Sequence, residues 1–122
     1  MSVSMTRSTL ADGAVEISPK GEIDVENAYA IKDAVAALLA EDRPGRIELN
    51  MQDITFIDSV GISALVSAHQ LAGISGVRLV VTRPSRFAHR QLWATGLLGL
   101  FGNPEPCPDC AEPSPQPAAS GS

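Results

Sequence analysis

The residues from Ile54 to Gly73, ITFIDSVGISALVSAHQLAG, change their hydrophobic pattern halfway along. The first half is a short apolar run that ends at Asp58, and the second half repeats apolar residues at helical spacing from just after Ser59. A strand that leads directly into a helix is a building unit of folds in which helices cover a sheet. The stretch therefore predicts a layered α/β fold, with a carboxylate and a hydroxyl side by side where a buried strand turns into a helix.

Alternating apolar and polar residues predict a β-hairpin at the start of the chain. One alternating run lies around Val3 and Met5, the second is AVEISPKG, and an Asp-Gly pair between them is a strong hairpin signal. A loop, GEID, follows at Gly21–Asp24, and Asp24 is placed to cap the next helix. The apolar stripe of that helix comprises Val25, Ala28, Ile31, Val35, Leu38 and Leu39.

The later part of the chain alternates between strand and helix patterns. Strands are predicted around Ile47–Asn50 and over Val77–Thr82, and the apolar character of the second suits an interior strand covered on both faces. Pro84 is placed to open a third helix, Gly96 to end it in the left-handed conformation, and Leu97–Phe101 to form a last short strand. We expect a small mixed sheet of about four to five strands, layered with about three helices.

The composition changes sharply after Asn103. Residues 104–122 hold six of the nine prolines and no Val, Ile, Leu or aromatic residue, which predicts a disordered tail behind a folded domain of residues 1–103. Cys107 and Cys110 form a CxxC motif in this tail. A lone CxxC offers two of the four ligands of a structural zinc site, so we expect an exposed, reduced pair of thiols; metal binding through dimerisation is the alternative. No cofactor or metal is expected.

Charge and hydropathy exclude several classes of function. The formal net charge is -5 and the pI about 4.8, which argues against nucleic acid and against an anionic membrane surface as partners. The apolar runs fall far short of the roughly 20 residues that a membrane span needs, and the first residues lack the apolar core of a signal peptide. We expect a cytoplasmic protein.

Ser59 admits two interpretations. Ser and Asp are ordinary N-cap residues, worth about 1 kcal/mol to a helix, so capping alone explains either of them. However, Asp58 and Ser59 are two candidate caps in tandem, and Gly61 in the first turn lowers helix stability while allowing close approach of another group. A phosphate on Ser59 would meet the free N–H groups and the positive dipole end of the helix, so a phosphorylation switch is the second interpretation.

A catalytic role for Ser59 is not supported. The nucleophile elbow of hydrolases needs glycine two residues before and two after the serine, and Ile57 stands at the first of these positions. Of the two histidines, His69 falls on the packing face of the helix that follows Ser59, and His89 is in another helix. We therefore expect no catalytic residues and no enzymatic activity.

Three arginines, Arg83, Arg86 and Arg90, have spacing suited to one helix face. A solvated helix face is the usual explanation for such a run. A contact with a partner is the alternative.

Four stretches, in this order, resemble the STAS domains, and within them the small anti-sigma factor antagonists of bacteria. The stretches are GEID, ITFIDSVGI, GVRLVV and RPSRFAHRQLWATGL, and the resemblance covers about residues 3–103. Val60 departs from the pattern, because many relatives carry Ser or Thr there, and the C-terminal helix usual in the family is replaced by the tail.

The resemblance implies a phospho-regulated binding protein. In the family, the serine of the D-S-x-G pattern, here Ser59, is phosphorylated by an anti-sigma factor that is also a serine kinase with a histidine-kinase-like ATPase fold. The unphosphorylated antagonist binds this kinase and releases a sigma factor, phosphorylation ends binding, and a serine phosphatase resets the switch. Implied docking residues are Asp24, Asp58, Ser59, Val60 and Gly61. The alternative is a STAS-type accessory or scaffold subunit of a larger assembly, such as a transporter, with Ser59 as a structural cap.

Overall fold

The computed structural model describes residues 3–41 and 44–105. The CxxC motif and most of the proline-rich tail lie outside these residues. The elements, in chain order, are β1 (Val3–Thr9), β2 (Val15–Ile23), α1 (Tyr29–Glu41), β3 (Arg46–Asn50), β4 (Asp53–Ile57), α2 (Ser59–Ile74), β5 (Arg78–Thr82), α3 (Arg86–Ala94) and the 3₁₀ helix η1 (Gly99–Phe101).

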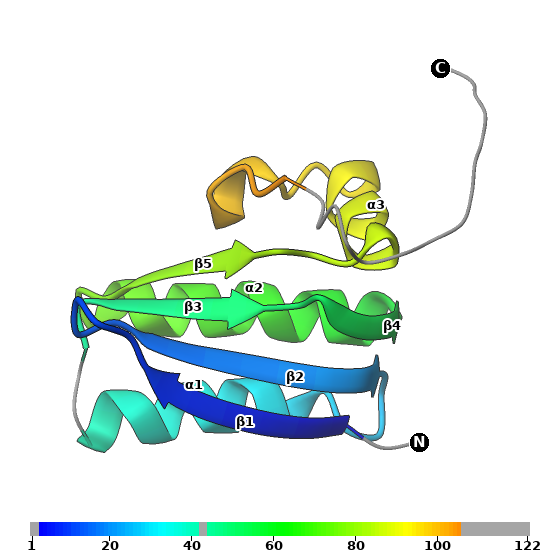
Figure 1. The fold of residues 1–122 in the computed structure, drawn as a ribbon. Helices are drawn as coiled ribbons and strands as arrows, with labels where there is room; N and C mark the ends of the chain where they lie inside the picture. The colour runs from blue at the N-terminus through cyan, green and yellow to red at the C-terminus, as the bar shows by residue number, and fades with distance from the viewer. Residues whose placement is uncertain (1–2, 42–43, 106–122) are drawn as a thin grey trace.

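The five strands form one mixed sheet, as the sequence predicts (Figure 1). The hairpin strands β1 and β2 are antiparallel, and the path continues through β3 to β5 by parallel pairing. The nine-residue β2 pairs with β1 along one edge and is long enough to pair with two strands in succession along the other edge. Its first part pairs with β3, and its second part pairs with β4, which places Ile23 beside Ile57 at the carboxyl ends of both strands.

Helices α1 and α2 cover one face of the sheet (Figure 1). The sheet is buried against them through alternate residues of β2, β3 and β5, as a strand with one covered face requires. The third helix packs on β4, and η1 packs on β5. The largest fully buried side chains are Phe101, Ile23, Ile31, Leu38, Ile47, Leu49, Met51, Ile54, Leu65, Leu79, Leu92 and Val35.

Two predictions around the first helix were wrong. Gly21–Ile23 is not a loop, because a register shift between Gly21 and Glu22 lets β2 continue and pair with β4. The first helix begins at Tyr29, four residues later than the apolar stripe suggests, because Asp24–Ala28 forms a separate hydrogen-bonded turn. Val25, assigned to the buried stripe, is therefore 66% exposed.

Three predictions in the second half also needed correction. Arg78–Thr82 forms an edge strand, because β5 pairs only with β3, although α2 and η1 cover its two faces. Pro84 precedes the third helix instead of opening it, since Ser85 is the N-cap. The segment Gly99–Phe101 is a 3₁₀ helix and not a strand. Gly96 does adopt the predicted left-handed conformation, with φ of 76°.

No helix within residues 3–41 and 44–105 combines the length and apolar character that a membrane crossing requires.

Gly61 gives the first testable prediction, because α2 lies too close to the strand ends there to admit a side chain. A Cβ atom built at Gly61 would lie 2.9 Å from the Ile23 carbonyl oxygen and 2.9 Å from the Cγ2 atoms of Ile23 and Ile57. Gly61→Ala therefore forces α2 away from two strand ends, and we expect it to lower the free energy of unfolding by about 1–3 kcal/mol in a chemical denaturation experiment.

Gly73→Ala is the matched control, since it lies in the same helix and a Cβ there meets no atom within 4 Å. Alanine should be neutral or stabilising at that position, by up to about 1 kcal/mol. Equal stabilities of the two variants would contradict the close packing of Gly61.

Candidate functional site

Asp58 joins the strand β4 to the helix α2. Its backbone is extended, with φ of -95° and ψ of -176°, and its side chain accepts a hydrogen bond from the Gly61 N–H at 2.8 Å. Its own N–H donates to the Ile23 carbonyl at 3.1 Å, and its carbonyl accepts from the Ile62 N–H at 3.0 Å. Asp58 is therefore the N-cap of α2 and also ties the junction to the end of β2.

Ser59 is the first residue of α2 and is exposed. Within the part of the chain that the structure describes, its hydroxyl makes no hydrogen bond. The sequence left two candidate caps in tandem, and the geometry gives this role to Asp58. The Ser59 hydroxyl is consequently accessible to solvent at the N-terminal end of a four-turn helix, where the dipole favours negative charge.

A compact turn lies beside this junction, at the end of β2. The Asp24 carboxylate accepts from the Glu26 N–H at 3.0 Å, and the Asp24 N–H donates to Asn27 Oδ1 at 2.9 Å. The buried Asn27 side chain also donates to the Glu22 carbonyl at 2.9 Å. Asp24 thus stabilises this turn. The prediction that it caps α1 directly is wrong, because α1 begins only at Tyr29.

The strand register brings Asp24 and Asp58 together. Ile23 and Ile57 are partners in the parallel β2–β4 ladder, so the next residue of each strand, Asp24 and Asp58, leaves the sheet at the same edge. Neighbouring strands lie about 4.8 Å apart. Two residues with carboxylates and the Ser59 hydroxyl therefore share one end of the molecule.

Apolar side chains flank this acidic group. Val60 is 43% exposed and Val25, on the neighbouring turn, is 66% exposed, whereas Gly61 is buried against Ile23. Gly61 therefore acts on the surface only through packing, by holding the helix end against the sheet. Sequence reasoning missed Val25 because its position continued a helical period; the spacing of Asp24 and Asn27, typical of a side-chain-bonded turn, was the available signal.

The arginine run is divided by the start of α3. Arg83 precedes the helix, has a φ of 46°, and donates from Nε to Gln52 Oε1 at 3.1 Å. Only Arg86 and Arg90 lie on α3, where both are exposed. The prediction of a shared helix face therefore holds for these two arginines and is wrong for Arg83.

Neither histidine is placed to serve Ser59 as a base. His69 follows it by ten residues, about 15 Å along α2, and its ring packs edge-on against Phe101 with centroids 5.5 Å apart. His89 lies on another helix, α3, where burial lowers the pKa of its imidazole. Residues 3–41 and 44–105 hold no group of three or more His, Cys, Asp or Glu side chains suited to a metal ion.

Comparison with known proteins identifies the family. The model of the STAS domain family matches residues 7–110, and the chain therefore belongs to that family. None of the curated proteins matches the chain.

The structure is similar to solved anti-sigma factor antagonists. An anti-sigma factor antagonist from Mycobacterium paratuberculosis is 27% identical, with a TM-score of 0.74 over 88% of this chain and 89% of that one. SpoIIAA in its unphosphorylated form is 17% identical, with a TM-score of 0.69 over 87% and 90% of the two chains. The Bacillus cell fate determinant SpoIIAA in the phosphorylated form is also 17% identical, with a TM-score of 0.64 over 87% of this chain and 93% of that one.

The solved structure of SLC26A9 shares the fold as well. SLC26A9 is 16% identical, with a TM-score of 0.64 over 80% of this chain but only 19% of that chain. The similarity to SpoIIAA and SLC26A9, below 25% identity, shows the fold alone.

The division of roles between Asp58 and Ser59 gives the second prediction. We expect Asp58→Ala to lower the free energy of unfolding by about 1 kcal/mol or more, because it removes the acceptor of the Gly61 N–H bond. Ser59→Ala removes a hydroxyl without an intramolecular partner and should change stability by less than about 0.5 kcal/mol. Urea denaturation of the two variants measures the difference; a larger loss in Ser59→Ala would show that Ser59 is the cap.

Proposed function

We propose that this chain is an anti-sigma factor antagonist whose partner binding is switched off by phosphorylation of Ser59. The observation that carries the proposal is the exposed Ser59 hydroxyl, which makes no hydrogen bond in the described residues while Asp58 beside it caps the helix. The likeness to the mycobacterial anti-sigma factor antagonist, at 27% identity over most of both chains, supports the same assignment.

The position of Ser59 allows a phosphate to be added at little cost to the fold. The hydroxyl makes no hydrogen bond within the described residues that phosphorylation would break, and the adjacent N–H groups at the start of α2 favour an anion. In agreement, the phosphorylated and unphosphorylated forms of SpoIIAA both share the fold of this chain. Phosphorylation on Ser59 is thus expected to change the surface and leave the sheet and helices in place.

The surface change would be electrostatic. A phosphate adds about -1.5 to -2 charges next to Asp58 and near Asp24. Two unit charges of the same sign about 5 Å apart repel by roughly 3 kcal/mol at an effective dielectric constant of 20. The proposed docking surface comprises Asp24, Asp58, Ser59 and Val60, and Gly61 holds the helix end below them. A partner docked there would have to accommodate the added charge in a desolvated contact and would dissociate.

The partners of this switch follow from the same chemistry. Neither histidine of the described residues is placed beside the Ser59 hydroxyl, so in our proposal the kinase supplies both the nucleotide and the catalytic groups. In our proposal, the kinase is an anti-sigma factor with a histidine-kinase-like ATPase fold, a separate serine phosphatase reverses the modification, and the chain acts in the cytoplasm as a binding protein without catalysis.

A second candidate is an accessory or scaffold role in a larger assembly, favoured by the fold shared with part of SLC26A9. In that role, Ser59 would have no modification, and its exposure would have no functional consequence. Phosphorylation separates the two candidates.

Phosphorylation by the cognate kinase is the third prediction. Incubation of the full chain with this kinase and ATP should add a single phosphate, located on Ser59 by peptide mass spectrometry. Ser59→Ala should take up no phosphate, and Ser63→Ala, which removes an exposed hydroxyl one turn further along α2, should be phosphorylated like the parent. Phosphate on another residue, or none with a kinase that binds the chain, would refute the proposed switch.

A further inference from the structure

The surface of α3 differs in charge from the rest of the protein. Residues 83–102 contain three arginines and no Asp or Glu, whereas the remaining residues hold six Lys and Arg against fourteen Asp and Glu. Arg86 and Arg90 form no ion pair with another residue in the described ranges. An acidic molecule therefore carries one basic helix whose charges are not neutralised internally.

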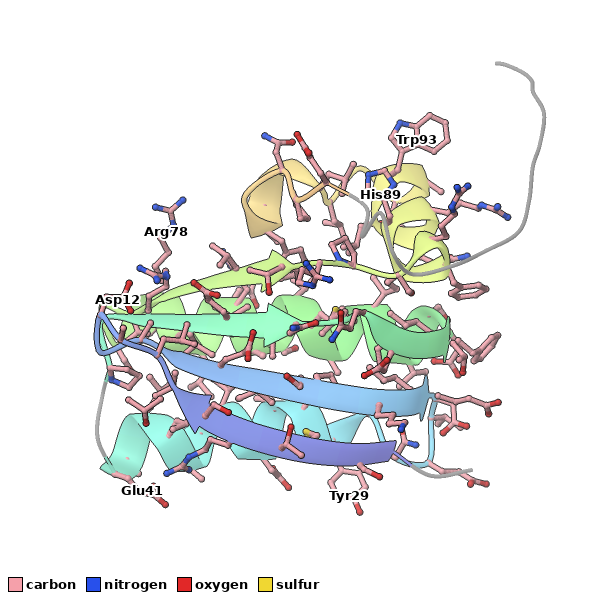
Figure 2. All side chains as sticks on the ribbon, viewed as in Figure 1. Asp12, Tyr29, Glu41, Arg78, His89 and Trp93 are labelled. Atoms are coloured by element: carbon pink, nitrogen blue, oxygen red, sulfur yellow. The ribbon has the colours of Figure 1, made fainter. Side chains whose placement is uncertain are left out.

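The exposed side of α3 is also aromatic. Ala88 and Leu92 are buried, and the helical period places Arg86, Arg90 and Trp93 together on the opposite side. Trp93, the only tryptophan in the chain, is 68% exposed, and its ring projects away from the ribbon beside His89 (Figure 2). Exposed tryptophan and arginine together are typical of the residues that contribute most to protein–protein binding. We call Arg86, Arg90 and Trp93 the α3 surface.

The α3 surface is connected to β4, the strand that ends just before Asp58 and Ser59. Ser85, the N-cap of α3, donates from its hydroxyl to the Ile54 carbonyl of β4 at 2.6 Å. The rings of Phe56 on β4 and Phe87 on α3 have centroids 5.5 Å apart. Figure 1 shows α3 on the same side of the molecule as the end of β4, so the helix keeps a fixed position relative to Ser59.

The distance between the two regions is within the width of one protein interface. An ordinary interface covers about 800 Å² on each partner, a patch roughly 30 Å across. The three residues from Phe56 to Ser59 span at most about 11 Å of extended chain, and Phe87 lies next to Phe56. One interface of ordinary width that covers Ser59 is therefore wide enough to extend to the Phe87 end of α3.

We propose that the kinase binds the α3 surface through acidic side chains opposite Arg86 and Arg90 and an apolar recess for the Trp93 indole. This inference rests on the proposed function and adds a second part to its docking surface. The complete interface would be bipolar, acidic around Asp24 and Asp58 and basic on α3. Such an arrangement fixes the orientation of the partner and steers its approach, because a rotated complex would bring like charges together.

The test compares charge reversals at two exposed arginines in the phosphorylation assay. Arg90→Glu alters the α3 surface, and Arg78→Glu makes the same change in net charge at the opposite end of the molecule from Trp93 (Figure 2). For Arg90→Glu we expect the KM of the kinase for the chain to rise about tenfold with kcat changed less than about twofold, because the residue docks the partner and does not touch the reacting atoms. Arg78→Glu should leave both constants within about twofold of the parent values.

Trp93 provides an independent readout with the unmodified chain. Binding of the kinase should shift the fluorescence emission of this single tryptophan to shorter wavelength, after the emission of the kinase alone has been subtracted. In the phosphorylation assay, Trp93→Ala should raise KM without changing kcat. Equal KM values for Arg90→Glu and Arg78→Glu would overturn the proposal. If Ser59 is phosphorylated in the parent while these KM values are equal, the switch stands and the α3 surface is not part of it. If Arg90→Glu and Trp93→Ala weaken kinase binding but Ser59 receives no phosphate, the docking surface stands and only the switch fails.

Discussion

The site depends on the way Asp58 connects three elements at one point. Its N–H is bonded to the end of β2, its side chain caps α2 through the Gly61 N–H, and it follows directly on β4. Close contact of Gly61 with the Ile23 carbonyl holds the helix against the strand ends, and a side chain at that position would prevent it. The orientation of the first turn of α2 and its distance from the sheet are therefore set by the Asp58 carboxylate and by the absence of a side chain at Gly61.

This connection explains why the proposed phosphorylation of Ser59 is compatible with an unchanged fold. Capping is assigned to Asp58, so the neighbouring hydroxyl is not needed for stability and stays in solvent. The same geometry keeps Asp24 and Asp58 at one edge of the sheet, where an added dianion meets two carboxylates. The proposed switch is therefore a change of surface charge on a rigid support, and α3 extends that support through its bonds to β4.

Local patterns in the sequence predicted the layered fold, the hairpin and the strand–helix junction at Asp58 and Ser59. These features depend on neighbours in the chain: the Asp-Gly turn, the helical period after Ser59 and the glycine in the first turn. The errors concern features that depend on distant residues. The extension of β2 through Gly21 requires pairing with β4, the edge position of β5 depends on strand order, and the exposure of Val25 follows from a turn that delays α1. Arg83 lies off the predicted helix face because α3 begins only at Arg86, after the N-cap Ser85.

The central claim is that negative charge on Ser59 ends partner binding without unfolding the chain. Calorimetric titration of the kinase with Ser59→Asp and Ser59→Asn tests it directly, since the two side chains have nearly the same size and differ in charge. Our account predicts that Ser59→Asp binds at least about tenfold more weakly than Ser59→Asn, a difference of ~1.4 kcal/mol, while both variants unfold at nearly the same temperature. Equal affinities of the two variants for the kinase would contradict it.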